Sequence, residues 1–140
     1  MNPDDYVSYP LALALKKADF DWECDHYYCA FDDETDVRFW SIHPAQSQNG
    51  LRTSQNTVVA DAPTLAQAQK WLREKKKIDV LVWNCACGYG WEVSKAENGT
   101  GLILFDDKGD NKDSGCWTSY ESALSAGIAA ALELIEKKGE

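Results

Sequence analysis

The sequence predicts an α+β fold, with an antiparallel or mixed sheet of about five strands and three helices packed on it. Apolar residues recur at helical spacing in three segments, and alternating apolar segments typical of strands lie between them. The predicted order is helix, hairpin, helix, strand, hairpin, helix, which is typical of α+β folds. The length of 140 residues fits one domain spanning residues 1–140.

The first helix is predicted from an apolar stripe that includes Val7, Leu11 and Leu15. Ser8 can cap this helix, and Pro10 suits its first turn. The next segments alternate between strand and loop patterns. We expect a hairpin of strands 23–31 and 37–43 around an acidic turn at 32–36, then a loop at 44–56 and a short strand at 57–60.

The second helix is predicted to begin at a capping box formed by Thr64 and Gln67. Residues 78–84 are apolar on both faces, which favours a central strand. Residues 89–94 alternate and predict a half-buried strand.

Asn98-Gly99 predicts a hairpin with a type I′ turn, which pairs the strand 89–94 with residues 102–105. The charged residues 106–115 are expected to form a loop.

A capping box of Thr118 and Glu121 predicts the start of the third helix. Gly127 lies on the buried side of this helix, although glycine in a helix interior costs about 1 kcal/mol relative to alanine. We therefore expect the helix to approach a strand or a large ring closely at Gly127. The predicted buried stripe consists of Tyr120, Leu124, Ile128, Ala131 and Ile135.

The charge balance restricts the partners that we expect. The chain has 23 acidic and 14 basic residues, a net charge of −9, which disfavours phosphate backbones and anionic membranes. The N-terminal residues 1–5 are acidic where a secretory signal is basic. Five cysteines, an odd number, favour free thiols. We expect a cytoplasmic protein that binds neither nucleic acid nor membrane.

Two blocks resemble a known family. They are APTLAQAQKWLRE at 62–74 and TSYESALSAGI at 118–128, the latter followed by ALELI at 131–135. As a pair they are similar to small phage-associated proteins of gut bacteria, a family without an assigned activity. The resemblance implies a shared fold and a prophage origin, and it transfers no functional residue.

Four residues are candidate metal ligands. Cys24 and His26 stand two residues apart, as do Cys85 and Cys87. Thiolate and imidazole are preferred zinc ligands, and a closed structural site needs four. Together the two pairs can supply one zinc site, although the usual spacing is Cys-x₂₋₄-Cys. The alternative is that these cysteines are small buried strand residues.

Two further functions follow from residue types. A thiol-dependent enzyme could pair Cys29, Cys85 or Cys116 with His26 or His43. No local signature supports such a pair. An acidic inhibitor could use its carboxylates to imitate nucleic-acid phosphates.

The large aromatic residues suggest a binding face. Tyr27, Trp40 and Trp83 are predicted on the less covered face of the sheet. Tyrosine and tryptophan are favoured at protein interfaces. We therefore expect a non-enzymatic interaction module of phage or prophage type, which binds a protein or itself and needs no cofactor.

Overall fold

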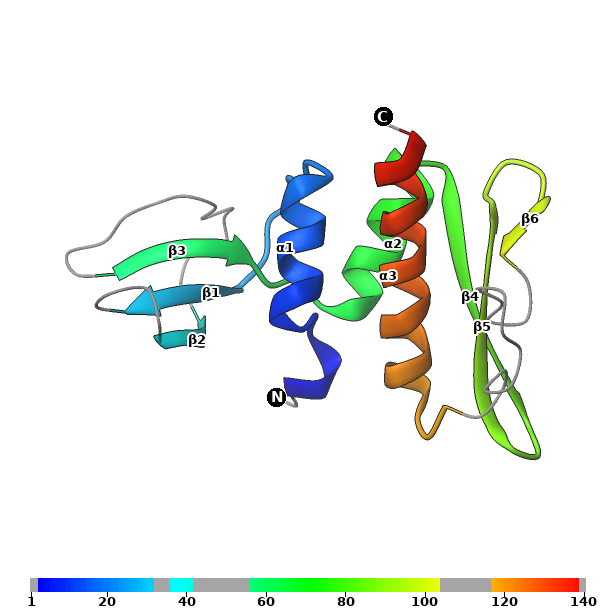
Figure 1. Ribbon diagram of the computed structural model, residues 1–140, viewed down its shortest axis with the longest axis horizontal. Helices are drawn as coiled ribbons and strands as arrows, with labels where there is room; N and C mark the ends of the chain where they lie inside the picture. The colour runs from blue at the N-terminus through cyan, green and yellow to red at the C-terminus, as the bar shows by residue number, and fades with distance from the viewer. Residues whose placement is uncertain (1–2, 32–35, 42–55, 104–116, 139–140) are drawn as a thin grey trace. The chain divides into compact units, whose positions relative to one another are not determined.

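The computed structural model describes residues 3–31, 36–41, 56–103 and 117–138, and it has an α+β fold (Figure 1). The chain forms two compact units, Met1–Thr64 and Leu65–Glu140. The described helices are the 3-10 turn η1 (Pro3–Asp5), α1 (Tyr9–Lys17), α2 (Leu65–Lys75) and α3 (Tyr120–Lys138). The described strands are β1 (His26–Phe31), β2 (Asp36–Ser41), β3 (Asn56–Asp61), β4 (Ile78–Cys85), β5 (Gly88–Lys95) and β6 (Gly101–Ile103).

The described strands form two three-stranded antiparallel sheets, where the sequence predicted one sheet of about five strands. The strand orders are β2-β1-β3 and β4-β5-β6. In each sheet the central strand, β1 or β5, pairs on both edges with strands of its own unit. The order of elements along the chain agrees with the prediction, and the short third strand, β3, is confirmed.

Unit 1 packs α1 against its sheet. Ser8 caps α1 as predicted, since its Oγ accepts a hydrogen bond from the amide of Leu11 (3.4 Å). The hydroxyl of Tyr28 on β1 donates to the backbone oxygen of Val7 at 2.7 Å. Lys16 of α1 donates to the backbone oxygen of Val59 at 2.8 Å, which gives a carbonyl of the edge strand β3 a partner.

Unit 2 places α2 and α3 on the same side of its sheet (Figure 1). The strand predicted as central, β4, is the edge strand, and β5 is central. Gln69 of α2 donates to the backbone oxygen of Val80 at 2.7 Å, which caps part of this edge. Val80 is fully buried, whereas Leu81 on the opposite face is 45% exposed. The apolar residues on that opposite face led to the wrong prediction for β4.

The hairpin at Asn98-Gly99 is confirmed, but its turn is not type I′. Gly99 has a φ of +76°, whereas Asn98 is not among the described residues with positive φ. The amide of Gly99 donates to the oxygen of Lys95 at 2.8 Å, and Asn98 Oδ1 accepts from the amide of Thr100 at 3.0 Å. The loop is thus longer than two residues, and within it only Gly99 has the positive φ that glycine adopts readily.

The capping box of α3 lies one residue later than predicted. Ser119, rather than Thr118, accepts a hydrogen bond from the amide of Ser122 (3.0 Å). Ser122 Oγ in turn accepts from the amide of Ser119 at 3.2 Å. This reciprocal pair satisfies two backbone donors at the helix start. Ser122 thus has the role in the capping box that was predicted for Glu121.

The buried stripe of α3 is confirmed in its centre and wrong at its start. Leu124, Ile128 and Ala131 are buried, whereas Tyr120 is 44% exposed because it lies in the first turn. Gly127 is buried against the sheet, as predicted.

Other predicted segments lie outside the described residues. These are most of the acidic turn at 32–36, the loop at 44–56 apart from its last residue, and the charged loop at 106–115. Within the described part of the chain, no helix combines the length and the hydropathy needed to cross a bilayer.

Candidate functional site

The four predicted metal ligands lie in two places. Cys24 and His26 flank the start of β1 in unit 1, whereas Cys85 ends β4 and Cys87 follows in the turn, both in unit 2. Across residues 3–31, 36–41, 56–103 and 117–138, no three His, Cys, Asp or Glu side chains are arranged to hold a metal ion. Neither pair is therefore part of a larger group of metal ligands within the described residues.

Cys24 is a buried thiol. Its Sγ donates to the backbone oxygen of His26 at 3.4 Å, and burial raises its pKa to about 12. Burial also raises the pKa of Cys29. Both thiols therefore hold their protons at neutral pH, which opposes a role as nucleophile, because the thiolate is the reactive form.

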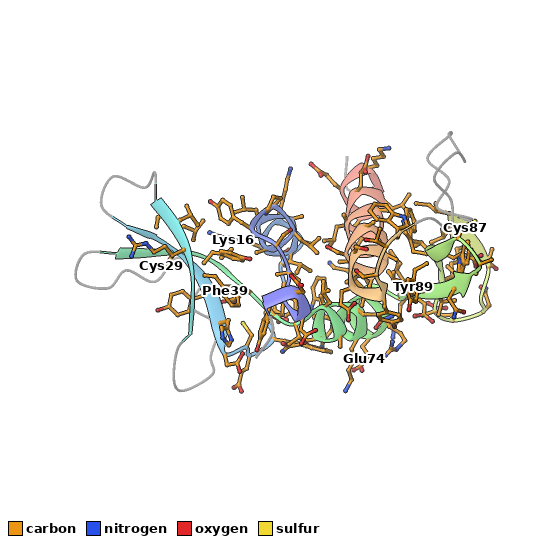
Figure 2. The ribbon with its side chains drawn as sticks, turned by 90° about the horizontal axis from the view of Figure 1, so that it is seen from below. Lys16, Cys29, Phe39, Glu74, Cys87 and Tyr89 are labelled. Carbon is orange, nitrogen blue, oxygen red and sulfur yellow. The ribbon has the colours of Figure 1, made fainter. Side chains whose placement is uncertain are left out.

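His26 is held by Asp25 within a cluster of aromatic rings. Its Nδ1 lies 2.7 Å from Oδ1 of Asp25. The imidazole stacks on Phe39 of β2, with centroids 4.7 Å apart and an interplanar angle of 11°, and meets the ring of Tyr6 at 4.4 Å. Tyr6 also donates its hydroxyl to Oδ1 of Asp25 at 3.4 Å. Figure 2 shows Phe39 in unit 1.

The Asp25–His26 pair has a defined proton arrangement. The hydrogen bond from His26 lowers the pKa of Asp25, so the carboxylate is ionised at neutral pH and can only accept. The proton of this hydrogen bond therefore sits on Nδ1, which leaves Nε2 as the nitrogen able to bind a ligand. His26 was predicted as a site residue from the sequence, whereas its immediate neighbour Asp25 was not. Consecutive strand residues point to opposite faces, whereas Asp25 lies at a bend before β1.

The three predicted aromatic binding residues do not share a sheet. Tyr27 pairs with Trp40 between β1 and β2, and Tyr27 is only 8% exposed. The side chain of Trp40 lies outside the described part of the structure. Trp83 belongs to β4 in unit 2, where it pairs with Gly90. The half-buried Trp83 ring occupies the space that a side chain at position 90 would need.

A second group of aromatic residues, which we call the aromatic patch, gathers where α3 begins. It consists of Tyr89, Trp117 and Tyr120. Trp117 exchanges two backbone hydrogen bonds of 2.9 Å with Tyr89 on β5. Tyr89 meets Tyr120 edge to face, with centroids 6.2 Å apart. Figure 2 labels Tyr89 in unit 2.

The aromatic patch exposes ring surface to solvent. Tyr120 is 44% exposed, and Tyr89 and Trp117 are half-buried. The Nε1 donor of Trp117 is buried and has no acceptor within the described residues. Tyr120 was predicted in the core from its place on the apolar stripe of the helix. The useful signal was the position of Tyr120 in the first helical turn, where a side chain can extend past the covered part of the sheet.

Comparison with known proteins finds no match for this chain among family models, curated proteins or solved structures.

Proposed function

We propose that this protein is a non-enzymatic interaction module of phage or prophage type, which binds a protein partner through the aromatic patch. The exposure of Tyr120 beside Tyr89 and Trp117 carries this proposal. Tyrosine and tryptophan dominate the binding energy of many protein interfaces, because their rings bury much apolar area at a small entropic cost.

The proposal includes a cytoplasmic location. The odd number of cysteines favours it, since that compartment keeps thiols reduced. The proposal assigns no catalytic step. The high pKa of Cys24 supports this choice, because that thiol stands beside the only described histidine, His26.

A photo-crosslinking experiment tests the proposed surface. A benzophenone amino acid replaces Tyr120 in one variant and Leu13, which is 38% exposed on α1, in the control variant. We expect a discrete crosslinked protein from position 120 and none from position 13. The identified partner is then purified, and its affinity is measured by calorimetry for the wild type, Tyr120→Ala and Leu13→Ala.

Tyr120→Ala should weaken binding at least about tenfold, which corresponds to a truncated interface residue worth more than 1 kcal/mol. Leu13→Ala should leave the affinity unchanged. Equal loss in both variants, or a partner that crosslinks only at position 13, would refute the aromatic patch as the binding surface.

A second candidate function is an acidic inhibitor that imitates nucleic acid, and the distribution of charge favours it. Residues 1–64 hold eleven acidic and four basic side chains, a net charge of −7, whereas residues 65–140 hold twelve and ten, a net charge of −2. An inhibitor of this kind would compete with DNA for a DNA-binding protein, and its binding would weaken steeply with salt. A crosslinked partner without nucleic-acid affinity would exclude it.

A further inference from the structure

The tip of the β4–β5 hairpin holds two exposed thiols. Cys85 is the last residue of β4 and pairs with Gly88, and Ala86 and Cys87 form the turn between them. Both cysteines are exposed and are not in disulfides. Figure 2 labels Cys87 on unit 2. The two thiols thus lie close together in the chain and are accessible to solvent.

This hairpin also lacks charge. Residues 80–91 contain no Asp, Glu, Lys or Arg, although charged residues make up 26% of the chain. The exposed positions among them include Leu81, Asn84, Cys85 and Cys87. Interface centres are depleted of charged residues, and two copies with a net charge of −9 repel least where each surface is neutral. The hairpin tip is therefore a suitable place for two copies to meet.

The chemistry of zinc explains why two copies would meet there. A closed structural zinc site takes four ligands in a tetrahedron, and four thiolates are a common set. One hairpin tip supplies two thiols, and the described residues hold no larger metal-binding group. Two tips related by a twofold axis supply four, which is the closed symmetric arrangement usual for homodimers.

The two cysteines of one copy stand on either side of Ala86, at the point where the hairpin turns. Residues two apart in an extended strand are separated by about 6.6 Å between Cα atoms. At Ala86 and Cys87 the chain reverses direction instead of continuing as a strand. The spacing Cys-x-Cys is shorter than the usual Cys-x₂₋₄-Cys. A chain that turns at this point keeps the two residues closer together than an extended strand does, which favours binding of both thiolates to one ion.

We infer that Cys85 and Cys87 from each of two copies bind one zinc ion, or a similar thiophilic divalent cation, and so join the hairpin tips in a dimer. As the four thiolates bind, four thiol protons pass to the solvent, and no oxidant or reductant is required. This inference goes beyond the proposed function, because the metal-bridged contact does not use the aromatic patch.

Zinc content and molecular mass, measured on the same sample, test the inference. The full-length protein is purified with a phosphine reductant, stripped with a chelator and dialysed against a small excess of Zn²⁺. Mass is then measured by sedimentation and zinc by elemental analysis. We expect a dimer with one zinc per two chains, and a monomer after renewed chelation.

Variants locate the ligands. Cys85→Ser and Cys87→Ser should each abolish the zinc-dependent dimer, whereas Cys116→Ser should leave it intact. Because Cys85 and Cys87 are exposed, the far-ultraviolet circular dichroism of both variants should match that of the wild type. Replacing Zn²⁺ by Co²⁺ should give the visible absorption of a tetrahedral thiolate site in the wild type only.

Three results would overturn the inference. One is a chain that binds no zinc at micromolar concentration. Another is one zinc per chain without dimerisation, and a third is loss of zinc in a His26→Gln variant, which would indicate that His26 joins the ligand set. The crosslinking experiment at Tyr120 reports on the aromatic patch independently of these outcomes.

Discussion

A Cβ atom added to Gly127 of α3 would lie 2.6 Å from Cγ1 of Val80 on β4. It would also lie 3.1 Å from Cβ of Trp91 on β5. Nonbonded carbon atoms prefer 3.5–4.0 Å, so the helix approaches the sheet more closely than any other residue at this position would allow. Val80 has little room to move, since it is fully buried and β-branched.

Gly127→Ala should leave the free energy of unfolding unchanged or lower it, despite the gain in helix propensity. Alanine contributes about 1 kcal/mol in propensity, and overpacking typically costs about 1–3 kcal/mol. Gly127→Leu should cost more than Gly127→Ala. Denaturant melts measure the free energy of unfolding of each variant. Ala129→Gly, at an exposed position of α3, measures the difference in helix propensity between alanine and glycine without a change in packing. A higher midpoint in both Gly127 variants would contradict the close approach.

The same contact predicts coupling between Gly127 and Val80. Val80→Ala alone should be destabilising, because it removes buried methyl groups. The methyl group introduced by Gly127→Ala can then occupy part of that space. In a double-mutant cycle the two changes should cost less together than the sum of their separate effects. Additive effects would show that the added methyl group finds room elsewhere.

Two adjacent hydroxyl residues provide a matched test of the α3 cap. Ser119→Ala removes the acceptor for the amide of Ser122 and should lower the free energy of unfolding by about 1 kcal/mol. Thr118→Ala, one residue earlier and exposed, should change it by less than about 0.5 kcal/mol. Urea unfolding followed by tryptophan fluorescence measures both. A larger loss of stability in Thr118→Ala than in Ser119→Ala would indicate that Thr118 caps the helix, as predicted from the sequence.

The Asp25–His26 hydrogen bond predicts a dependence on acid pH. The pKa of Asp25 is lower in the folded state than its unfolded value of about 4. The stabilisation is therefore present above pH ~4 and is lost as the pH falls through the lower, folded pKa. His26→Phe keeps a ring against Phe39 but removes the donor.

We expect the Asp25 pKa, measured by carboxyl NMR, to rise towards its usual value in His26→Phe. The difference in free energy of unfolding between wild type and His26→Phe should shrink from pH 7 to pH 3. His26→Gln, which keeps a donor, serves as the control. An Asp25 pKa that is the same in His26→Phe and wild type would show that the hydrogen bond has no energetic role.

Thiol reactivity should divide the cysteines by burial. In the native protein stripped of metal, Cys85 and Cys87 should react rapidly with iodoacetamide, and Cys24 and Cys29 only after unfolding, because burial raises the pKa values of the latter two. After denaturation without reductant, anaerobically purified protein should show five free thiols, one per cysteine. Peptide mass spectrometry assigns each modification. Rapid native labelling of Cys24 would contradict the described burial.

Much of the secondary structure could be predicted because its signals are local. Ser8 caps α1 as expected, and strands lie within or close to the segments predicted from aromatic, apolar or alternating residues. The one-residue error at α3 arose because both Thr118 and Ser119 are followed, three residues later, by a side chain that can complete a capping box. Only the backbone geometry distinguishes the two.

The residues of the proposed binding sites were harder to predict. Cys85 and Cys87 could be selected from residue type alone, but their exposure could not. Tyr120 was expected in the core because its helical position matches the buried stripe. The periodicity of a helix describes direction around its axis, and it does not indicate where along the axis the covering sheet ends.

The sequence by itself determined the α+β class, the three helices and the burial of Gly127, because capping, periodicity and propensity act over a few neighbouring residues. The tertiary structure decided that the strands form two sheets, that β4 is an edge strand, and that Asp25 holds His26. It also decided that Tyr120 is exposed. Strand partners, side-chain pairs and exposure depend on which distant segments of the chain come into contact. Those contacts are set by the free energy of the whole folded chain, and local sequence patterns do not contain them.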